Sequence, residues 1–146
     1  MVKKADKKVF IDTNILVYST NHDSPFKSQS DKLLRELLLS EITIFINLQV
    51  IREYLVVSSR DSIQGMSPIL KNILAFKSVF NILEDSEESF SKLLFLVEKY
   101  NVKGKQIHDA NIVACMLSNG VNTIVTNNEK DFERFKDLIE IIPLAA

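Results

Sequence analysis

Two aspartates follow predicted strands, at the end of a sheet where ligands bind in α/β proteins. Asp12 comes directly after the apolar run 9–11, and Asp131 comes shortly after Thr126, which ends the apolar run 123–126. The functional cleft of an open parallel sheet lies outside the carboxyl ends of the strands, so both side chains can reach it. Each also has a structural explanation, since Asp12 can cap the next helix and Asp131 can lie in a solvated loop. Position alone leaves capping and function equally open for Asp12 and favours the structural explanation for Asp131.

Two further acids lie on predicted helices beside apolar side chains. Glu53 is three residues after Val50 and four before Val57, so all three share a helix face that we expect to be buried. Asp109 stands at the start of the apolar stripe 112–116. An ionised carboxylate on a buried face is costly unless it is compensated. For Asp109 the alternative is an acid in the first helical turn, where the helix dipole favours it.

Taken together, the four acids predict a divalent metal site at one end of the sheet. Carboxylates that gather in one place repel one another, and a divalent cation relieves the repulsion. Oxygen ligands without cysteine or a histidine cluster favour Mg²⁺ or Mn²⁺ over zinc. Such an ion activates water and holds the phosphate oxygens of an in-line displacement, so the pattern favours phosphoryl chemistry.

The elements that would position these acids alternate between short apolar runs and longer helical patterns. Strands are expected at 9–11, 43–46, 79–83, 123–126 and 140–142, with helices in the segments between the first four of them. The alternation predicts an α/β fold, a three-layer α/β/α sandwich with a mostly parallel central sheet. We expect one domain spanning residues 1–146.

Several residues mark the expected ends of the helices. Ser67 followed by Pro68 is typical of an N-cap and first helical position. Ser86 and the acids after it resemble a capping box. Gly120 is expected just beyond the helix 107–118, because glycine commonly ends a helix. A shorter helical segment is expected at 132–138.

Composition excludes several classes of protein. The 146 residues are 46% hydrophobic and 25% charged, as in a folded globular chain rather than a disordered one. One cysteine, Cys115, excludes an intramolecular disulfide and indicates a reducing cytoplasm, and no apolar run reaches the ~18 residues of a membrane span. The net charge of -1 gives no overall basic footprint. Glycine-rich phosphate-binding and serine-hydrolase motifs are missing from the sequence.

Four segments resemble, in order, the successive motifs of the PIN-domain nucleases. They read VFIDTNILVY at 9–18, QVIREY at 49–54, IHDANIVA at 107–114 and TNNEKDF at 126–132. The likeness covers nearly the whole chain and is greatest to the VapC-type toxin ribonucleases of toxin–antitoxin pairs. It implies that the metal-binding, catalytic acids are Asp12, Glu53, Asp109 and Asp131. One departure is Asn128, which stands where many members carry an acid, so that the carboxylate arrives at Asp131 instead.

The same resemblance implies a parallel sheet flanked by helices and an Mg²⁺-dependent endoribonuclease, in which Mn²⁺ can substitute. It also implies a homodimer and a cognate antitoxin protein whose C-terminal segment covers the site. The residues expected to orient carboxylates or water are Thr13, Asn14, Thr126 and Asn128. Candidate contacts to RNA phosphates are the lysines at 3, 4, 7, 8, 103 and 105, although solvated charge explains most of them equally simply.

Other functions remain open at this point. One is a PIN nuclease of RNA maturation or decay without an antitoxin. Another is a non-catalytic PIN-like module that binds RNA or protein, which Asn128 favours but the other acids do not. A third is a plain α/β binding domain in which the four carboxylates are dispersed. Metal affinity, a neighbouring antitoxin gene and the fold itself distinguish these alternatives.

Overall fold

The computed structural model describes residues 7–60 and 62–144. Its central element is a five-stranded sheet in the order β3-β2-β1-β4-β5, and every pair of neighbouring strands is parallel. The strands are β1 (Lys8–Ile11), β2 (Thr43–Ile46), β3 (Asn81–Ile82), β4 (Thr123–Thr126) and β5 (Glu140–Pro143). The predicted parallel sheet is confirmed.

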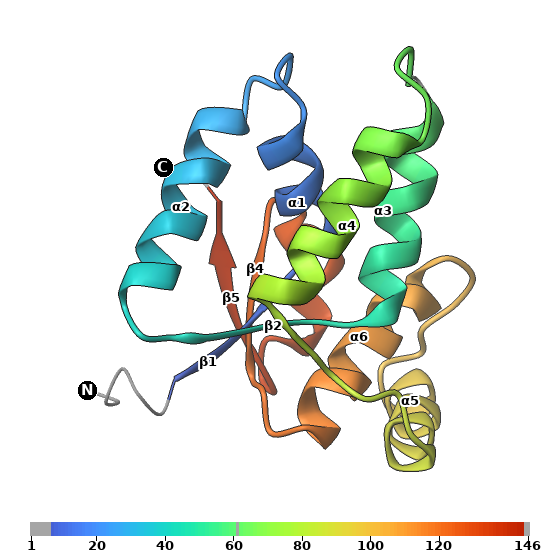
Figure 1. Ribbon diagram of the computed structural model, residues 1–146. Helices are drawn as coiled ribbons and strands as arrows, with labels where there is room; N and C mark the ends of the chain where they lie inside the picture. Colours follow the sequence, from blue (N-terminus) through green and yellow to red (C-terminus); the bar gives the residue numbers. More distant parts are fainter. Residues whose placement is uncertain (1–6, 61, 145–146) are drawn as a thin grey trace.

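Helices cover both faces of this sheet (Figure 1). The described residues form α1 (Thr13–Thr20), α2 (Lys27–Leu39), α3 (Leu48–Arg60), α4 (Ser67–Val79), α5 (Glu87–Lys99) and α6 (Gln106–Ser118). The chain crosses from β1 to β2 to β3 in one direction and then returns to β4 and β5. Because such crossovers are right-handed, α1 to α4 lie on one face and α5 and α6 on the other. The three-layer α/β/α sandwich is therefore confirmed.

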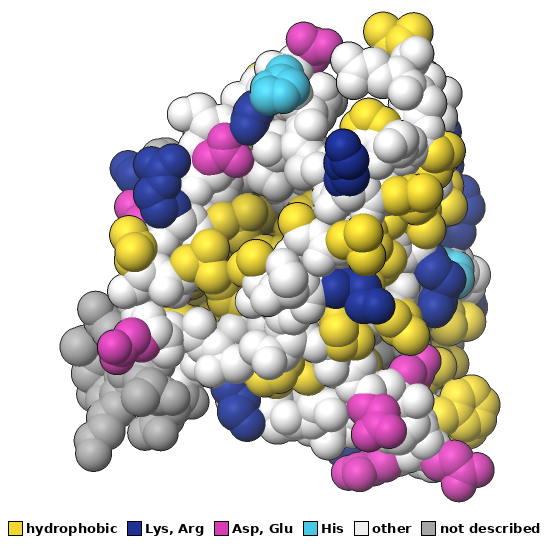
Figure 2. All heavy atoms as spheres, in the orientation of Figure 1, with side chains coloured by type: hydrophobic (Ala, Val, Ile, Leu, Met, Phe, Trp, Pro, Cys, Tyr) yellow, Lys and Arg dark blue, Asp and Glu magenta, His cyan; other side chains and the backbone are white. Residues whose placement is uncertain are grey.

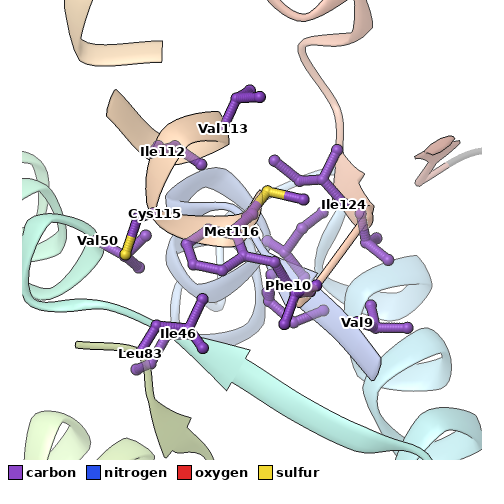
Figure 3. Close-up of a cluster of buried hydrophobic side chains, with 14 of the residues drawn as sticks. Val9, Phe10, Ile46, Val50, Leu83, Ile112, Val113, Cys115, Met116 and Ile124 are labelled. Carbon is purple, nitrogen blue, oxygen red and sulfur yellow. The ribbon is translucent and has the colours of Figure 1, made fainter. Parts of the chain in front are cut away.

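Apolar side chains from the strands and the covering helices form the core (Figure 3). Phe10 of β1 and Ile124 of β4 are fully buried and lie beside Met116 of α6. Cys115 is also fully buried, as a small apolar residue of α6. This packing holds α6 against the middle of the sheet, over β1 and β4.

The helix ends agree with the sequence in part. Gly120 adopts the left-handed conformation (φ +74°) just past α6, as predicted. Ser86 caps α5 in a capping box, with Ser89 as its partner. Ser67 is not the N-cap but the first residue of α4, and Met66 precedes it without a side-chain cap.

Two predicted elements are wrong in extent. The strand at 79–83 shrinks to β3, because α4 continues through Val79 and the buried Phe80 follows it outside the sheet. The helical segment at 132–138 is replaced by two short 3₁₀ turns, Glu129–Asp131 and Glu133–Phe135.

The surface of the α3 and α4 side carries exposed apolar side chains, which gather over these helices in Figure 2. They include Val56 of α3 and Leu70 and Leu74 of α4. Within the described ranges no helix is both long and apolar enough to cross a membrane. Lys3 and Lys4, two candidate RNA contacts, lie outside the described residues.

Candidate active site

Asp12 is held at the corner between β1 and α1 by three kinds of donor. Its Oδ1 accepts a hydrogen bond from the backbone N–H of Thr13 (2.8 Å), which makes Asp12 the N-cap of α1. Its Oδ2 accepts hydrogen bonds from Thr126 Oγ1 (2.8 Å) and Asn14 Nδ2 (3.3 Å). The capping role therefore coexists with a position at the carboxyl end of the sheet.

Burial and neighbouring charges disfavour the ionised form of the Asp12 carboxyl group. The residue is 7% exposed. Burial, together with the nearby carboxylates of Glu53 and Asp131, raises its pKa from 3.8 to about 6, against the opposing effect of the hydrogen bonds from Thr126 and Thr13. Two other acids thus act on Asp12 electrostatically.

Thr126 ends β4 and ties the strand to the start of α1. Its hydroxyl donates to Asp12 and accepts hydrogen bonds from Asn14 Nδ2 (3.2 Å) and from the backbone N–H of Asn128 (3.0 Å). Asn14 in turn accepts a hydrogen bond from the backbone N–H of Asn127 (3.1 Å). These bonds join the ends of two adjacent parallel strands around one carboxylate.

Glu53 projects from α3 with both carboxylate oxygens bonded. Its Oε2 accepts from Thr13 Oγ1 (2.9 Å) and its Oε1 from Gln49 Nε2 (2.9 Å). The predicted face of α3 is buried only in part, since Val50 is fully buried but Val57 is 42% exposed. The expected burial of this face is therefore confirmed at Val50 but wrong at Val57, which borders an open cleft.

Gln49 links α3 to α6, a feature that sequence reasoning missed. Its amide nitrogen donates to the backbone carbonyl of His108 (2.9 Å) as well as to Glu53, and its amide oxygen accepts from Asn111 Nδ2 (2.6 Å). The i−4 spacing of Gln49 from Glu53 was the available signal. The residue on α6 that follows His108 is Asp109, so the link sets the distance between two of the acids.

Asp109 lies in the first turn of α6 and is half-buried. Burial, together with the carboxylates of Asp131, Asp12 and Glu53, raises the pKa of its carboxyl group from 3.8 to about 7, against the opposing effect of the guanidinium of Arg134. All three other predicted acids therefore act on Asp109.

Asp131 ends the first 3₁₀ turn after β4 and is exposed. It lines the same cleft as the other three acids, together with Asn128. The structure thus brings all four predicted acids to one place. The dispersed arrangement expected of a plain α/β binding domain is wrong.

This acidic cleft has a volume of about 540 Å³. Besides the acids and their bonded neighbours, its walls carry Tyr18 from α1 and Arg52, Val56 and Arg60 from α3. The two arginines and the tyrosine were not among the residues predicted from the sequence. Arg52, Val56 and Arg60 are four residues apart, so the signal was a repeating face of α3.

The residues of the acidic cleft fit a divalent cation by their chemistry. All four side chains offer carboxylate oxygens, which Mg²⁺ and Mn²⁺ prefer. Burial and mutual repulsion raise the pKa of Asp12 and Asp109, and a cation would relieve the repulsion. As they stand, no three His, Cys, Asp or Glu side chains in the described ranges are close enough to hold an ion.

The family profile of the PIN domain matches residues 9–138 of this sequence, nearly its whole length. The chain belongs to the PIN domain family. The matched range includes both strand ends and all four acids of the acidic cleft. The expectation from the sequence motifs is confirmed at the level of the family.

Solved structures share the fold of this PIN domain at low sequence identity. VapBC2 from Rickettsia felis, bound to a DNA fragment from its promoter, is 24% identical over 93% of this chain and 98% of its own, with a TM-score of 0.71. VapBC-1 from nontypeable Haemophilus influenzae is 19% identical over 94% and 98%, with a TM-score of 0.67. A sarcin–ricin loop cleaving VapC toxin from Mycobacterium tuberculosis is 14% identical over 80% and 86%, with a TM-score of 0.61. No curated protein matches this PIN domain in sequence.

Proposed function

We propose that this PIN domain is an Mg²⁺-dependent endoribonuclease that hydrolyses RNA phosphodiester bonds, with Mn²⁺ as a possible substitute ion. The observation that carries the proposal is the meeting of four carboxylates from β1, α3, α6 and the turn after β4 in one cleft. Burial and the repulsion among these carboxylates raise the pKa of two of them, Asp12 and Asp109. Acids with raised pKa values that gather in an open cleft are typical of a functional site, and a bound cation would offset their repulsion.

In this proposal Asp12, Glu53, Asp109 and Asp131 hold the metal and are the catalytic acids. When bound, the ion supplies Lewis-acid activation of water and neutralises charge on the phosphate. The side chains that surround the acids keep them in place. Asp12 is oriented by Thr126 and Asn14, while Thr13 and Gln49 orient Glu53.

We further propose that the protein is the toxin of a toxin–antitoxin pair in the cytoplasm. Three toxin or toxin–antitoxin structures with the same fold support this assignment. The partners it implies are an antitoxin protein, which would cover the acidic cleft, and a second copy of the chain. Exposed apolar side chains on α4 and α5, such as Leu74, Phe90 and Phe95, are surface that such partners can bury.

Cleavage of an unpaired RNA pool tests the enzymatic proposal. We expect wild type to cut the pool with Mg²⁺ and not with a chelator, and Asp109→Asn to lose activity while keeping its fold by circular dichroism. Glu88→Gln is the matched control, because Glu88 is an acid in the first turn of another helix, outside the cleft. Equal rates for wild type and Asp109→Asn would contradict the proposal. A wild type that binds RNA without cutting it would favour the non-catalytic module.

A further inference from the structure

A second hollow adjoins the acidic cleft. It lies where α1, the end of α3 and the start of α4 meet, and its volume is about 470 Å³. We call it the side hollow. Val17 of α1 and Val57 of α3 line both the acidic cleft and the side hollow, so the two spaces meet over these side chains. A ligand held in one can therefore extend into the other.

The two spaces differ in chemistry. The acidic cleft carries four carboxylates and two arginines. The described lining of the side hollow includes no lysine or arginine and a single carboxylate, that of Asp23, next to His22. The rest of the lining consists mostly of neutral hydrogen-bonding groups and apolar surface. Among them are Thr20, Ser58 and Asn72, beside the buried Ile69 and Tyr54. A nucleobase needs this combination, because its edges form hydrogen bonds and its faces pack on apolar or aromatic groups.

One face of α3 runs along the acidic cleft. Arg52, Val56 and Arg60 recur every fourth residue and all line the acidic cleft, with the arginines about 12 Å apart along the helix axis. Arg52 forms no ion pair with the described residues, although four carboxylates share its cleft. A guanidinium is well suited to phosphate oxygens. The arginines can therefore hold the backbone of a strand that passes the acids.

We propose that the side hollow binds the base of an unpaired nucleotide next to the phosphodiester in the acidic cleft. This inference rests on the proposed ribonuclease function and adds a recognition site to it. The base must turn away from its neighbours to enter, which an unpaired strand allows and a duplex resists. The side hollow thereby makes the protein selective for single strands or loops, and for the base that fits.

A substitution that fills the side hollow tests the proposal without touching the acids. Ser58 lines it, is half-buried on α3 and donates no side-chain hydrogen bond to a described residue. Ser58→Trp would occupy the space for a base. Ser59→Trp is the matched control, because Ser59 is the next residue of the same helix, is exposed and lines neither space.

Binding is measured first, in an Asp109→Asn background that reduces the repulsion of phosphate. The probes are a fluorescent unpaired oligoribonucleotide and an abasic strand of equal length, followed by anisotropy. We expect Ser58→Trp to bind the oligoribonucleotide about tenfold more weakly than the parent does, as for the loss of one stacked base. Its affinity for the abasic strand should equal that of the parent. Ser59→Trp should bind both like the parent. Equal affinity of the parent for both strands, equal weakening by both tryptophans, or no binding at all would overturn the proposal.

Cleavage of a random unpaired RNA pool then separates this inference from the proposed function. We expect Ser58→Trp to change the base preference at one position beside the cut bond and Ser59→Trp to keep it. Cleavage with the same preference in all three proteins would overturn the side hollow as a base site and leave the ribonuclease intact. A wild type that cuts no RNA with Mg²⁺ would overturn the ribonuclease itself.

Discussion

At the scale of single residues, the carboxylates of the acidic cleft repel one another more strongly as the pH rises and they ionise. Burial and neighbouring carboxylates raise the pKa of Asp12 to about 6 and that of Asp109 to about 7. The unfolded chain loses the same protons near pH 4. Proton binding by these two groups therefore stabilises the folded state fully below about pH 4. This stabilisation is lost as the pH rises through about 6 for Asp12 and about 7 for Asp109. Without metal, these two groups make the protein less stable at pH 8 than in weak acid.

The first prediction concerns Asp109, the acid with the larger rise. Asp109→Asn removes the repelled charge. With a chelator present at pH 8, its free energy of unfolding should therefore be about 1–2 kcal/mol higher than that of wild type. The side chain is half exposed, and solvent reduces the effect below that of full burial. Urea unfolding at pH 8 and near pH 4 measures the difference, which should vanish at the lower pH. Glu88→Gln should follow wild type, and a destabilised Asp109→Asn at pH 8 would contradict the account.

At the scale of elements, the link between α3 and α6 holds two acids at a set distance. Gln49 donates to Glu53 and to the carbonyl of His108, and accepts from Asn111. Gln49 is 8% exposed, so its partners would lose their hydrogen bonds in a site with little access to water. The acids can meet around one ion only while these two helices keep their spacing.

We therefore expect Gln49→Ala to lower the free energy of unfolding by about 1–3 kcal/mol and to weaken metal-dependent cleavage. Gln106→Ala is the control, because Gln106 starts α6 and bonds Arg134 at an exposed position, where surface substitutions change stability by about 0.5 kcal/mol or less. Urea unfolding and a cleavage assay give the two readouts. If both alanine variants matched in stability and activity, the link would have no role in the site.

Most elements could be predicted because their apolar residues recur with a clear period. The predictions failed where one apolar run serves two elements. Val79 and Phe80 continue the apolar side of α4 directly into the segment before β3, so the sequence alone does not mark the change. Phe132 and Phe135 are three residues apart, which suits an α-helix as well as the 3₁₀ turns that form.

The acids of the site were predictable for a related reason. Asp12 and Asp131 follow strands, and the parallel sheet brings strand ends to one edge. The amide link between Gln49 and Asn111 was not predictable, because it joins residues that are 62 positions apart and depends on how two helices pack. The same holds for the side hollow, which three separate helices enclose.

At the scale of the whole molecule, exposed apolar side chains on α4 and on α5 bear on assembly. Leu74, Phe90 and Phe95 are each more than half exposed. The proposed homodimer would bury such surface. Sedimentation equilibrium should therefore give a mass of about 33 kDa, twice the 16.7 kDa of the chain. A mass that stays at that of one chain over all concentrations would contradict the proposed dimer.

The central claim is that the four carboxylates hold a divalent cation, and thermal unfolding at pH 8 tests it most directly. An ion present at about ten times its Kd stabilises the fold by about 1.4 kcal/mol, which raises Tm by about 4 °C for a chain of this size. We predict this rise for wild type with Mn²⁺ or Mg²⁺, and no rise for Asp109→Asn under the same conditions. An unchanged Tm in wild type, or an equal rise in both proteins, would contradict a metal site in the acidic cleft.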